Sequence, residues 1–131
     1  MKILVVDDET DMRRLFEQRF RREIRSGEFT FVFAYSGEEA LSYMHEHHSE
    51  VVLILSDINM PGMSGLELLR QVRQQYPAPV PPRTPVVMIL TAYGDQETHA
   101  QALALGADDF LTKPVDFAAL KVKLLGRVLS A

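Results

Sequence analysis

Five polar side chains follow apolar segments of this chain, and together they could handle a phosphoryl group. Three are carboxylates, Asp7, Asp8 and Asp57, and the others are the hydroxyl of Thr91 and the ammonium of Lys113. Clustered carboxylates repel one another unless a cation compensates them, and oxygen ligands without His or Cys suit Mg²⁺. The hydroxyl and the ammonium would then hold an anion. A carboxylate that attacks phosphorus forms an acyl phosphate, whose transition-state charge Mg²⁺ and the lysine would neutralise.

These side chains can meet only if the segments before them are strands of one parallel sheet. Asp57 alone proves little, because an acid can simply cap the end of a strand. The carboxyl ends of parallel strands, however, lie along one edge of the sheet, where open α/β folds place their chemistry. Short apolar runs bounded by turn residues are typical of strands buried on both faces. The predicted strands are 3–6, 29–34, 51–55, 86–90 and 110–111.

Segments with helical periodicity separate the predicted strands. Ser36 and Ser64 each begin a capping box, and Asp116 is placed to cap the last helix. The order is β-α five times over, which predicts an α/β fold with a doubly wound parallel sheet and right-handed crossovers. The predicted helices are 10–25, 37 to about 48, 65–76, 96–105 and 117–128.

The first predicted helix, 10–25, has an apolar face and an arginine-rich face. We expect the apolar residues to pack inward because they recur at helical spacing. We expect the arginine-rich face to be exposed to solvent, with Glu17 and Glu23 offsetting part of its positive charge. The alternative is that this face is a docking surface for an acidic partner. The expected inward residues are Met12, Leu15, Phe16, Phe20 and Ile24, and the arginines are Arg13, Arg14, Arg21, Arg22 and Arg25.

The composition is that of one ordinary globular domain. The chain has 131 residues, 47% hydrophobic and 24% charged, which is enough to bury a core. Its 14 basic and 18 acidic residues give a net charge of −4, which argues against direct nucleic-acid binding. The lack of cysteine excludes disulfides and thiol chemistry and is compatible with a cytoplasmic setting. No apolar run approaches the roughly 20 residues that span a membrane.

Four segments closely resemble the receiver domain of two-component response regulators. They are Val-Asp-Asp-Glu at 6–9, Ser-Asp-Ile-Asn-Met-Pro-Gly-Met-Ser-Gly at 56–65, Leu-Thr-Ala at 90–92 and Gly-Ala-Asp-Asp-Phe-Leu-Thr-Lys-Pro at 106–114. The resemblance implies one domain over residues 1–131, with a flavodoxin-like sheet of strand order 2-1-3-4-5. It implies a signalling switch that catalyses only its own phosphorylation and dephosphorylation.

The resemblance also assigns roles at the acidic cluster. Asp57 would be the phosphoacceptor, taking the phosphoryl group from a phosphohistidine of a sensor histidine kinase or a histidine phosphotransfer protein. Asp8, Asp57 and the backbone carbonyl of Asn59 would bind Mg²⁺, or Mn²⁺ in its place, and Asp7 would help through a water molecule.

The remaining implied roles concern switching. Thr91 would hydrogen-bond the phosphoryl group and Lys113 would pair with it, while the Lys113–Pro114 peptide bond would be cis. Phe110 occupies the position of the family's switch aromatic; the family often has Tyr there, so readout through a ring hydroxyl is lost here. Asn59 and Tyr93 would tune dephosphorylation, and we predict that the bulk of Tyr93 slows it.

Two other classes of protein share parts of this pattern. One is a HAD-like phosphatase with an aspartyl nucleophile, a class that carries an Asp-x-Asp motif after its first strand. In this chain Asp7 and Asp8 are adjacent, and Asn59, two residues after Asp57, is an amide that cannot act as a general acid. A flavodoxin-like FMN carrier needs a hydroxyl- and glycine-rich phosphate loop, and acids there would repel phosphate.

The resemblance finally implies a set of partners. Besides the kinase, it implies a downstream output domain or protein and leaves a phosphorylation-dependent homodimer open, with no membrane contact and a cytoplasmic location. The proline-rich segment 77–85 is longer than the family's usual connection. We expect it to be a stiff surface loop, and Pro79 to Pro82 also has the spacing of a PxxP motif.

Overall fold

Within residues 1–77, 85–92 and 96–129, which the structure describes, five strands form one parallel sheet. The structure is a computed structural model. The strand order is β2-β1-β3-β4-β5, which confirms the predicted doubly wound α/β fold. The strands are β1 (Lys2–Val6), β2 (Thr30–Ala34), β3 (Val51–Asp57), β4 (Val86–Thr91) and β5 (Asp109–Thr112).

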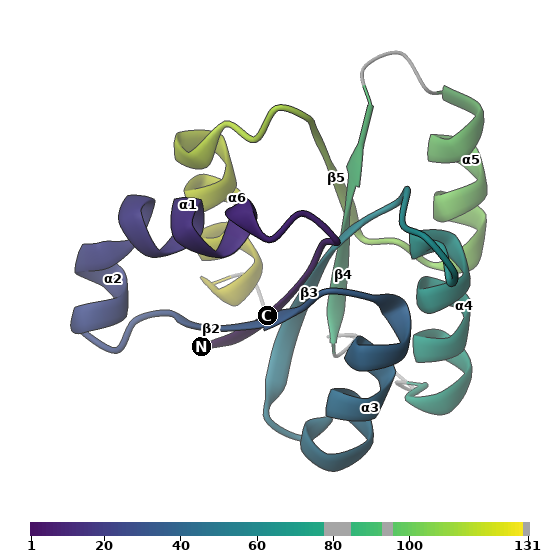
Figure 1. Cartoon of the computed structure of the whole chain (residues 1–131), viewed down its shortest axis with the longest axis horizontal. Helices are drawn as coiled ribbons and strands as arrows, with labels where there is room; N and C mark the ends of the chain where they lie inside the picture. The colour runs from purple at the N-terminus through teal and green to yellow at the C-terminus, as the bar shows by residue number, and fades with distance from the viewer. Residues whose placement is uncertain (78–84, 93–95, 130–131) are drawn as a thin grey trace.

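Helices cover both faces of this sheet, so its strands are apolar on both sides. As Figure 1 shows, α1, α2 and α6 lie on one face, and α3, α4 and α5 lie on the other. The helices are α1 (Asp11–Arg19), α2 (Arg21–Arg25), α3 (Gly37–His47), α4 (Gly65–Gln75), α5 (Gln96–Leu105) and α6 (Phe117–Leu129).

Alternate residues of each strand enter separate cores. Leu4 and Val6 pack into the core under α3 and α4, whereas Ile3 and Val5 pack into the core under α1 and α6. This division follows from the two-residue period of a strand, which sends successive side chains to opposite faces. The sheet is therefore fixed from both sides, and the ends of its strands are held in register.

The single helix predicted over 10–25 is broken at Phe20 into α1 and α2. Phe20 has φ −110° and ψ 25°, outside the helical region, and its ring is 2% exposed. The ring is held by an aromatic cluster that includes Phe16, Phe29, Phe31 and Phe117.

The inward face of this segment was only partly predicted. Leu15 and Ile24, which were expected to be inside, are 40% and 36% exposed, and Glu23 is buried instead. Leu15 precedes the break, and Glu23 keeps the inward spacing because it lies seven residues after Phe16, so the interruption at Phe20 accounts for neither. Glu23 is buried where it accepts a hydrogen bond from Lys121 of α6.

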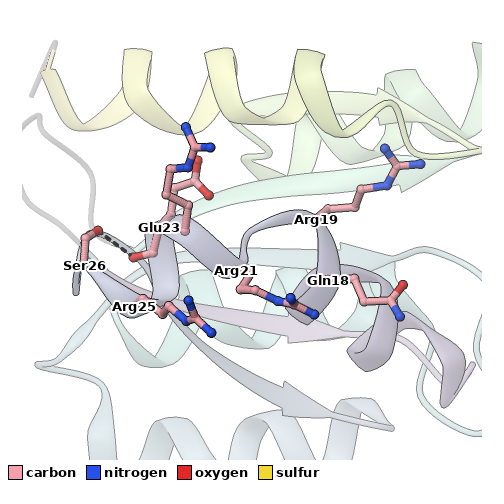
Figure 2. Close-up of a pocket in the computed structure, with 7 residues that line it drawn as sticks. Gln18, Arg19, Arg21, Glu23, Arg25 and Ser26 are labelled. Carbon is pink, nitrogen blue, oxygen red and sulfur yellow. Dashed lines mark hydrogen bonds between the residues drawn. The ribbon is translucent and has the colours of Figure 1, made fainter.

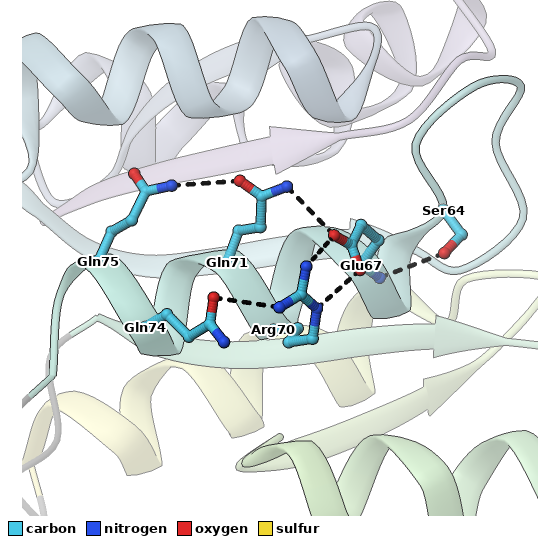
Figure 3. Close-up of polar contacts among 6 residues, drawn as sticks. All are labelled: Ser64, Glu67, Arg70, Gln71, Gln74 and Gln75. Atoms are coloured by element: carbon cyan, nitrogen blue, oxygen red, sulfur yellow. Dashed lines mark hydrogen bonds and ion pairs between the residues drawn. The ribbon is translucent and has the colours of Figure 1, made fainter.

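Helix α4 begins where the sequence predicts, but its capping box is only half formed. The Glu67 amide donates to Ser64 Oγ at 3.2 Å. The Glu67 carboxylate does not reach back to Ser64 as a full capping box requires. It instead accepts hydrogen bonds from Arg70 and Gln71 along the outer side of the helix (Figure 3), and the Arg70 partner holds the pKa of Glu67 at about 2.

The other two predicted caps are present. The Glu39 amide donates to Ser36 Oγ at 3.1 Å, and the Ala119 amide donates to Asp116 Oδ1 at 3.1 Å. The Glu39 carboxylate accepts from the amide of Tyr35, one residue before the capping serine. The proposed PxxP spacing at Pro79 and Pro82 lies outside the described residues.

Candidate functional site

The predicted site residues follow the carboxyl ends of neighbouring strands. Asp7 comes directly after β1, Asp57 ends β3 and Thr91 ends β4, while Lys113 follows β5 directly. Main-chain hydrogen bonds hold these ends together, because the Lys113 amide donates to the Thr91 carbonyl at 2.8 Å. The strand order 2-1-3-4-5 places β1 and β3 side by side at the centre, so their acids meet.

Three carboxylates form a cluster at this edge. One oxygen from each of Asp7, Asp8 and Asp57 lies within 4.8 Å of the others. Asp7 and Asp57 are buried, at 2% and 5% exposure, while Asp8 is exposed. Two buried carboxylates this close carry unfavourable repulsion, which a cation can relieve.

Lys113 supplies part of the compensating charge. Its Nζ lies 2.8 Å from Asp57 Oδ2 and 3.3 Å from Asp7 Oδ2. Burial by itself would lower the pKa of Lys113, but the hydrogen bond and charge of Asp57, with the charge of Asp7, more than offset it and raise the pKa. The lysine therefore stays protonated and ready to pair with an anion.

The two oxygens of Asp7 differ in their partners. Oδ1 accepts a hydrogen bond from the Glu9 amide at 2.9 Å. The buried Oδ2 has no well-oriented hydrogen bond among the described residues, and its charged neighbour is Lys113 Nζ at 3.3 Å. Burial, with the nearby charge of Asp57, raises the pKa of Asp7, although the Glu9 amide and Lys113 act in the opposite direction. An unsatisfied buried oxygen beside two further carboxylates is the donor set of a hard divalent cation, so these residues fit Mg²⁺.

Gly65 lets α4 start against the end of β3. An ideal Cβ at this position would lie 2.2 Å from the Asp57 carbonyl oxygen and 2.7 Å from Ile58 Cα. The Gly65 amide donates to the Ile58 carbonyl at 2.9 Å, and the Asn59 amide lies 3.4 Å from Asp57 Oδ1. The sequence places Gly65 in a capping box and at the end of the segment 56–65 that resembles the receiver family. Its close approach to β3 was not predicted, because it depends on two segments meeting in space.

The predicted switch residues lie at the same edge. Thr91 is 6% exposed, and Phe110 in β5 is partly buried against the core under α4 and α5. The ring of Phe110 also contacts the ring of His99 in α5, with centroids 3.5 Å apart, a partner that the sequence did not reveal. The Lys113–Pro114 peptide bond is cis, the geometry that the resemblance implies. Tyr93 lies outside the described residues.

The chain belongs to the response regulator receiver domain family, whose model matches residues 3–125. It is 41% identical over 123 residues to the response regulator protein PilR of Pseudomonas aeruginosa, covering 92% of this chain and 24% of that protein. It is 36% identical over 124 residues to the two-component response regulator PhoP of the same organism, covering 95% and 49% respectively. The chain thus spans a quarter to a half of the length of these relatives.

Solved structures agree with this assignment. The receiver domain of NtrX from Brucella abortus matches with a TM-score of 0.80 and 27% identity over 98% of this chain and 99% of that chain. The chemotaxis protein CheY4 of Vibrio cholerae matches with a TM-score of 0.76 and 29% identity over 97% of each chain.

Family membership confirms the predicted function, a two-component phosphoacceptor switch, and the HAD-like phosphatase is not favoured. Receiver domains bind Mg²⁺ at an acidic pocket and interact with histidine kinases and output domains. Among the helices in the described ranges, none is long and apolar enough to cross a membrane.

Proposed function

We propose that Asp57 is the phosphoacceptor of this receiver domain and that it works in a site assembled by Asp7, Asp8, Thr91 and Lys113. The observation that carries the proposal is the position of the Asp57 carboxylate. It ends a central strand, lies in a three-carboxylate cluster and is held by Lys113 Nζ at 2.8 Å. No other described group of His, Asp and Glu side chains gathers three ligand atoms in this way.

The first step is an in-line displacement at phosphorus. A carboxylate oxygen of Asp57 attacks the phosphoryl group of a phosphohistidine on a sensor kinase or phosphotransfer protein. The new bond is an acyl phosphate, the P–N bond breaks, and the imidazole leaves with a proton from solvent. Lys113 shifts from its ion pair with the free carboxylate to the phosphoryl oxygens, so its charge remains paired throughout.

A divalent cation completes the site. Asp8 and Asp57, with the carbonyl of Asn59, would hold Mg²⁺ directly and Asp7 would act through a water molecule; Mn²⁺ would serve in its place. The fit rests on the unsatisfied Asp7 Oδ2 and on the all-oxygen donor set. When bound, the ion neutralises charge that develops on the phosphoryl oxygens.

Thr91 and Phe110 would convert phosphorylation into a change of surface. The Thr91 hydroxyl would move to bond a phosphoryl oxygen, which would free space for the ring of Phe110 to turn inward. That movement would separate the ring from His99, which it touches here. The altered face of α5, β5 and α6 would then engage an output domain or partner, or a second copy of the chain.

We assign the remaining roles as part of the same proposal. The domain covers residues 1–131, resides in the cytoplasm, binds no nucleic acid itself and catalyses nothing beyond its own phosphorylation and dephosphorylation. Asn59 and Tyr93 set the lifetime of the acyl phosphate. Replacing Tyr93 with a small residue should therefore speed dephosphorylation.

The test is the intact mass of the protein after incubation with acetyl phosphate and Mg²⁺. We expect a gain of one phosphoryl group, which Asp57→Asn and omission of Mg²⁺ should both abolish. Asp11→Asn is the matched control, because Asp11 is an exposed acid at the start of α1 outside the cluster. An adduct that persists in Asp57→Asn would disprove the acceptor assignment, and steady phosphate release without an adduct would indicate a turnover enzyme.

A further inference from the structure

The end of α1 and the short helix α2 surround a hollow of about 750 Å³ that is lined by arginines. Four of its seven lining residues carry a guanidinium, and the seven are Gln18, Arg19, Arg21, Arg22, Glu23, Arg25 and Ser26. Figure 2 shows Arg21 and Arg25 extending from α2 to the same side as Gln18, while Arg19 extends toward α6. The hollow is separate from the phosphoryl site, because none of its lining residues belongs to that site and α1 places about 10 Å of helix between its own start and Gln18.

The positive charge of the hollow is not compensated by its own acid. Glu23 is the one acid in the lining, and its Oε2 accepts a hydrogen bond from Lys121 of α6 at 2.6 Å. That hydrogen bond lowers the pKa of Glu23, so the carboxylate stays ionised and paired with Lys121 instead of with the arginines. The guanidiniums of Arg21 and Arg25 have no ion-pair or hydrogen-bond partner among the described residues.

This arrangement costs stability unless an anion is present. Arg21 and Arg25 are four residues apart on one helix, where like charges destabilise it. The chain as a whole has a net charge of −4, so a cluster of four arginines stands against an acidic background. Arginine forks match carboxylates bidentately, which makes the cluster a better ligand for carboxylates than scattered lysines would be.

We propose that this arginine hollow docks an acidic segment of a partner protein, with several Asp or Glu carboxylates close together. Charge complementarity selects the occupant. A nucleic acid needs phosphate contacts spread along an extended basic surface, whereas this patch is confined to one turn of α1 and a five-residue helix, and the rest of the chain repels a long polyanion. The Lys121–Glu23 ion pair holds α2 against α6, so the arginines of α2 start from a fixed element.

The experiment measures binding of a fluorescent hexaglutamate peptide to the 131-residue chain by anisotropy, with hexaglutamine as the uncharged peptide. We expect saturable binding of hexaglutamate only, weakened about tenfold or more in the Arg21→Gln/Arg25→Gln variant. The matched control is Arg13→Gln/Arg14→Gln, which removes the same charge from exposed positions of α1 outside the hollow. The control should change binding by less than about twofold.

Several outcomes would overturn the proposal. Equal losses in both double variants would mean that only long-range charge is sensed, and absence of saturable binding would mean that there is no site. Tighter, hollow-dependent binding of a single-stranded DNA oligonucleotide would reassign the patch to nucleic acid. A dimer in sedimentation that the Arg21→Gln/Arg25→Gln variant abolishes would reassign it to a second copy of this chain. Both variants should still unfold cooperatively and be labelled by acetyl phosphate at the unchanged rate, which shows that the fold and the phosphoryl site are intact.

Discussion

Replacing Gly65 with alanine tests how much the close packing of α4 against β3 contributes to stability, apart from the helix propensity of the residue. The added Cβ would lie 2.2 Å from the Asp57 carbonyl oxygen, whereas ordinary contact begins at 3.4 Å. The start of α4 must therefore move by about 1 Å, which stretches the hydrogen bond from the Gly65 amide to the Ile58 carbonyl. Backbone atoms cannot yield as a side chain does, so we expect a loss of about 3 kcal/mol, at the upper end of overpacking costs.

Two other glycines of this chain provide internal controls. Gly126 lies in α6 with nothing within 4 Å of its ideal Cβ, so Gly126→Ala should gain about 0.5–1 kcal/mol from helix propensity. Gly27 has equally open space but a φ of +80°, so Gly27→Ala should lose about 1–2 kcal/mol from backbone strain alone. The three substitutions add the same methyl group, and they differ in the space around it and in the backbone conformation that carries it.

The assay is thermal unfolding followed by circular dichroism, together with the rate of acetyl phosphate labelling. For 131 residues a change of 1 kcal/mol shifts Tm by about 3–4 °C, so Gly65→Ala should lower Tm by roughly 10 °C. Labelling should slow as well, because the Asp57 backbone is displaced. A Tm for Gly65→Ala no lower than that of Gly27→Ala would refute the argument from close approach.

Three further predictions concern charged groups. Asp7→Asn should raise stability by roughly 1–2 kcal/mol without metal, because burial disfavours the charged carboxylate. Mg²⁺ should raise the Tm of this variant by less than it raises the Tm of the unmodified chain, and equal Mg²⁺ shifts would contradict the prediction. Glu23→Gln should cost about 1 kcal/mol at pH 7, because the ion pair with Lys121 stabilises the fold above the unfolded-state pKa of the Glu23 carboxyl. The difference in unfolding free energy between the variant and the parent chain should vanish below the lowered folded-state pKa. A pH-independent difference in urea unfolding would refute this prediction. Arg73→Met should cost about 3 kcal/mol, because its side chain is 12% exposed and its guanidinium bonds the carboxylate of Asp108 and two backbone carbonyls. Arg70→Met, which removes a more exposed ion pair with Glu67, should lower Tm much less, and equal effects would show that burial is irrelevant.

Much of the fold follows from short-range patterns in the sequence. The apolar run before Asp57 is too short and too β-branched for a helix, and turn residues follow it directly, so it forms β3 as predicted. Serine at positions 36 and 64 begins helices because its hydroxyl can satisfy an orphan amide, whatever the rest of the chain does. The order of these elements leaves few ways to assemble them, and the sheet has the expected one.

The break at Phe20 shows where such local reasoning fails. Nothing in residues 10–25 marks an interruption, since no glycine or proline stands there. At the break the ring of Phe20 packs against Phe29, Phe31 and Phe117, and the last of these belongs to α6, far along the chain. Burial of Glu23 follows in the same way, since its partner Lys121 is 98 residues further along the sequence.

The sequence by itself determined the residue types of the site and the strands that present them, because strand formation and helix capping depend on neighbouring residues. Only the tertiary structure decided which atoms touch. The distance of 2.8 Å between Lys113 Nζ and Asp57 Oδ2, the unsatisfied oxygen of Asp7 and the tight approach of Gly65 each join segments that meet through packing. The arginine hollow also depends on packing. Residues 18–26 supply its side chains, but its shape depends on the break at Phe20 and on the hydrogen bond from Lys121 of α6 to Glu23.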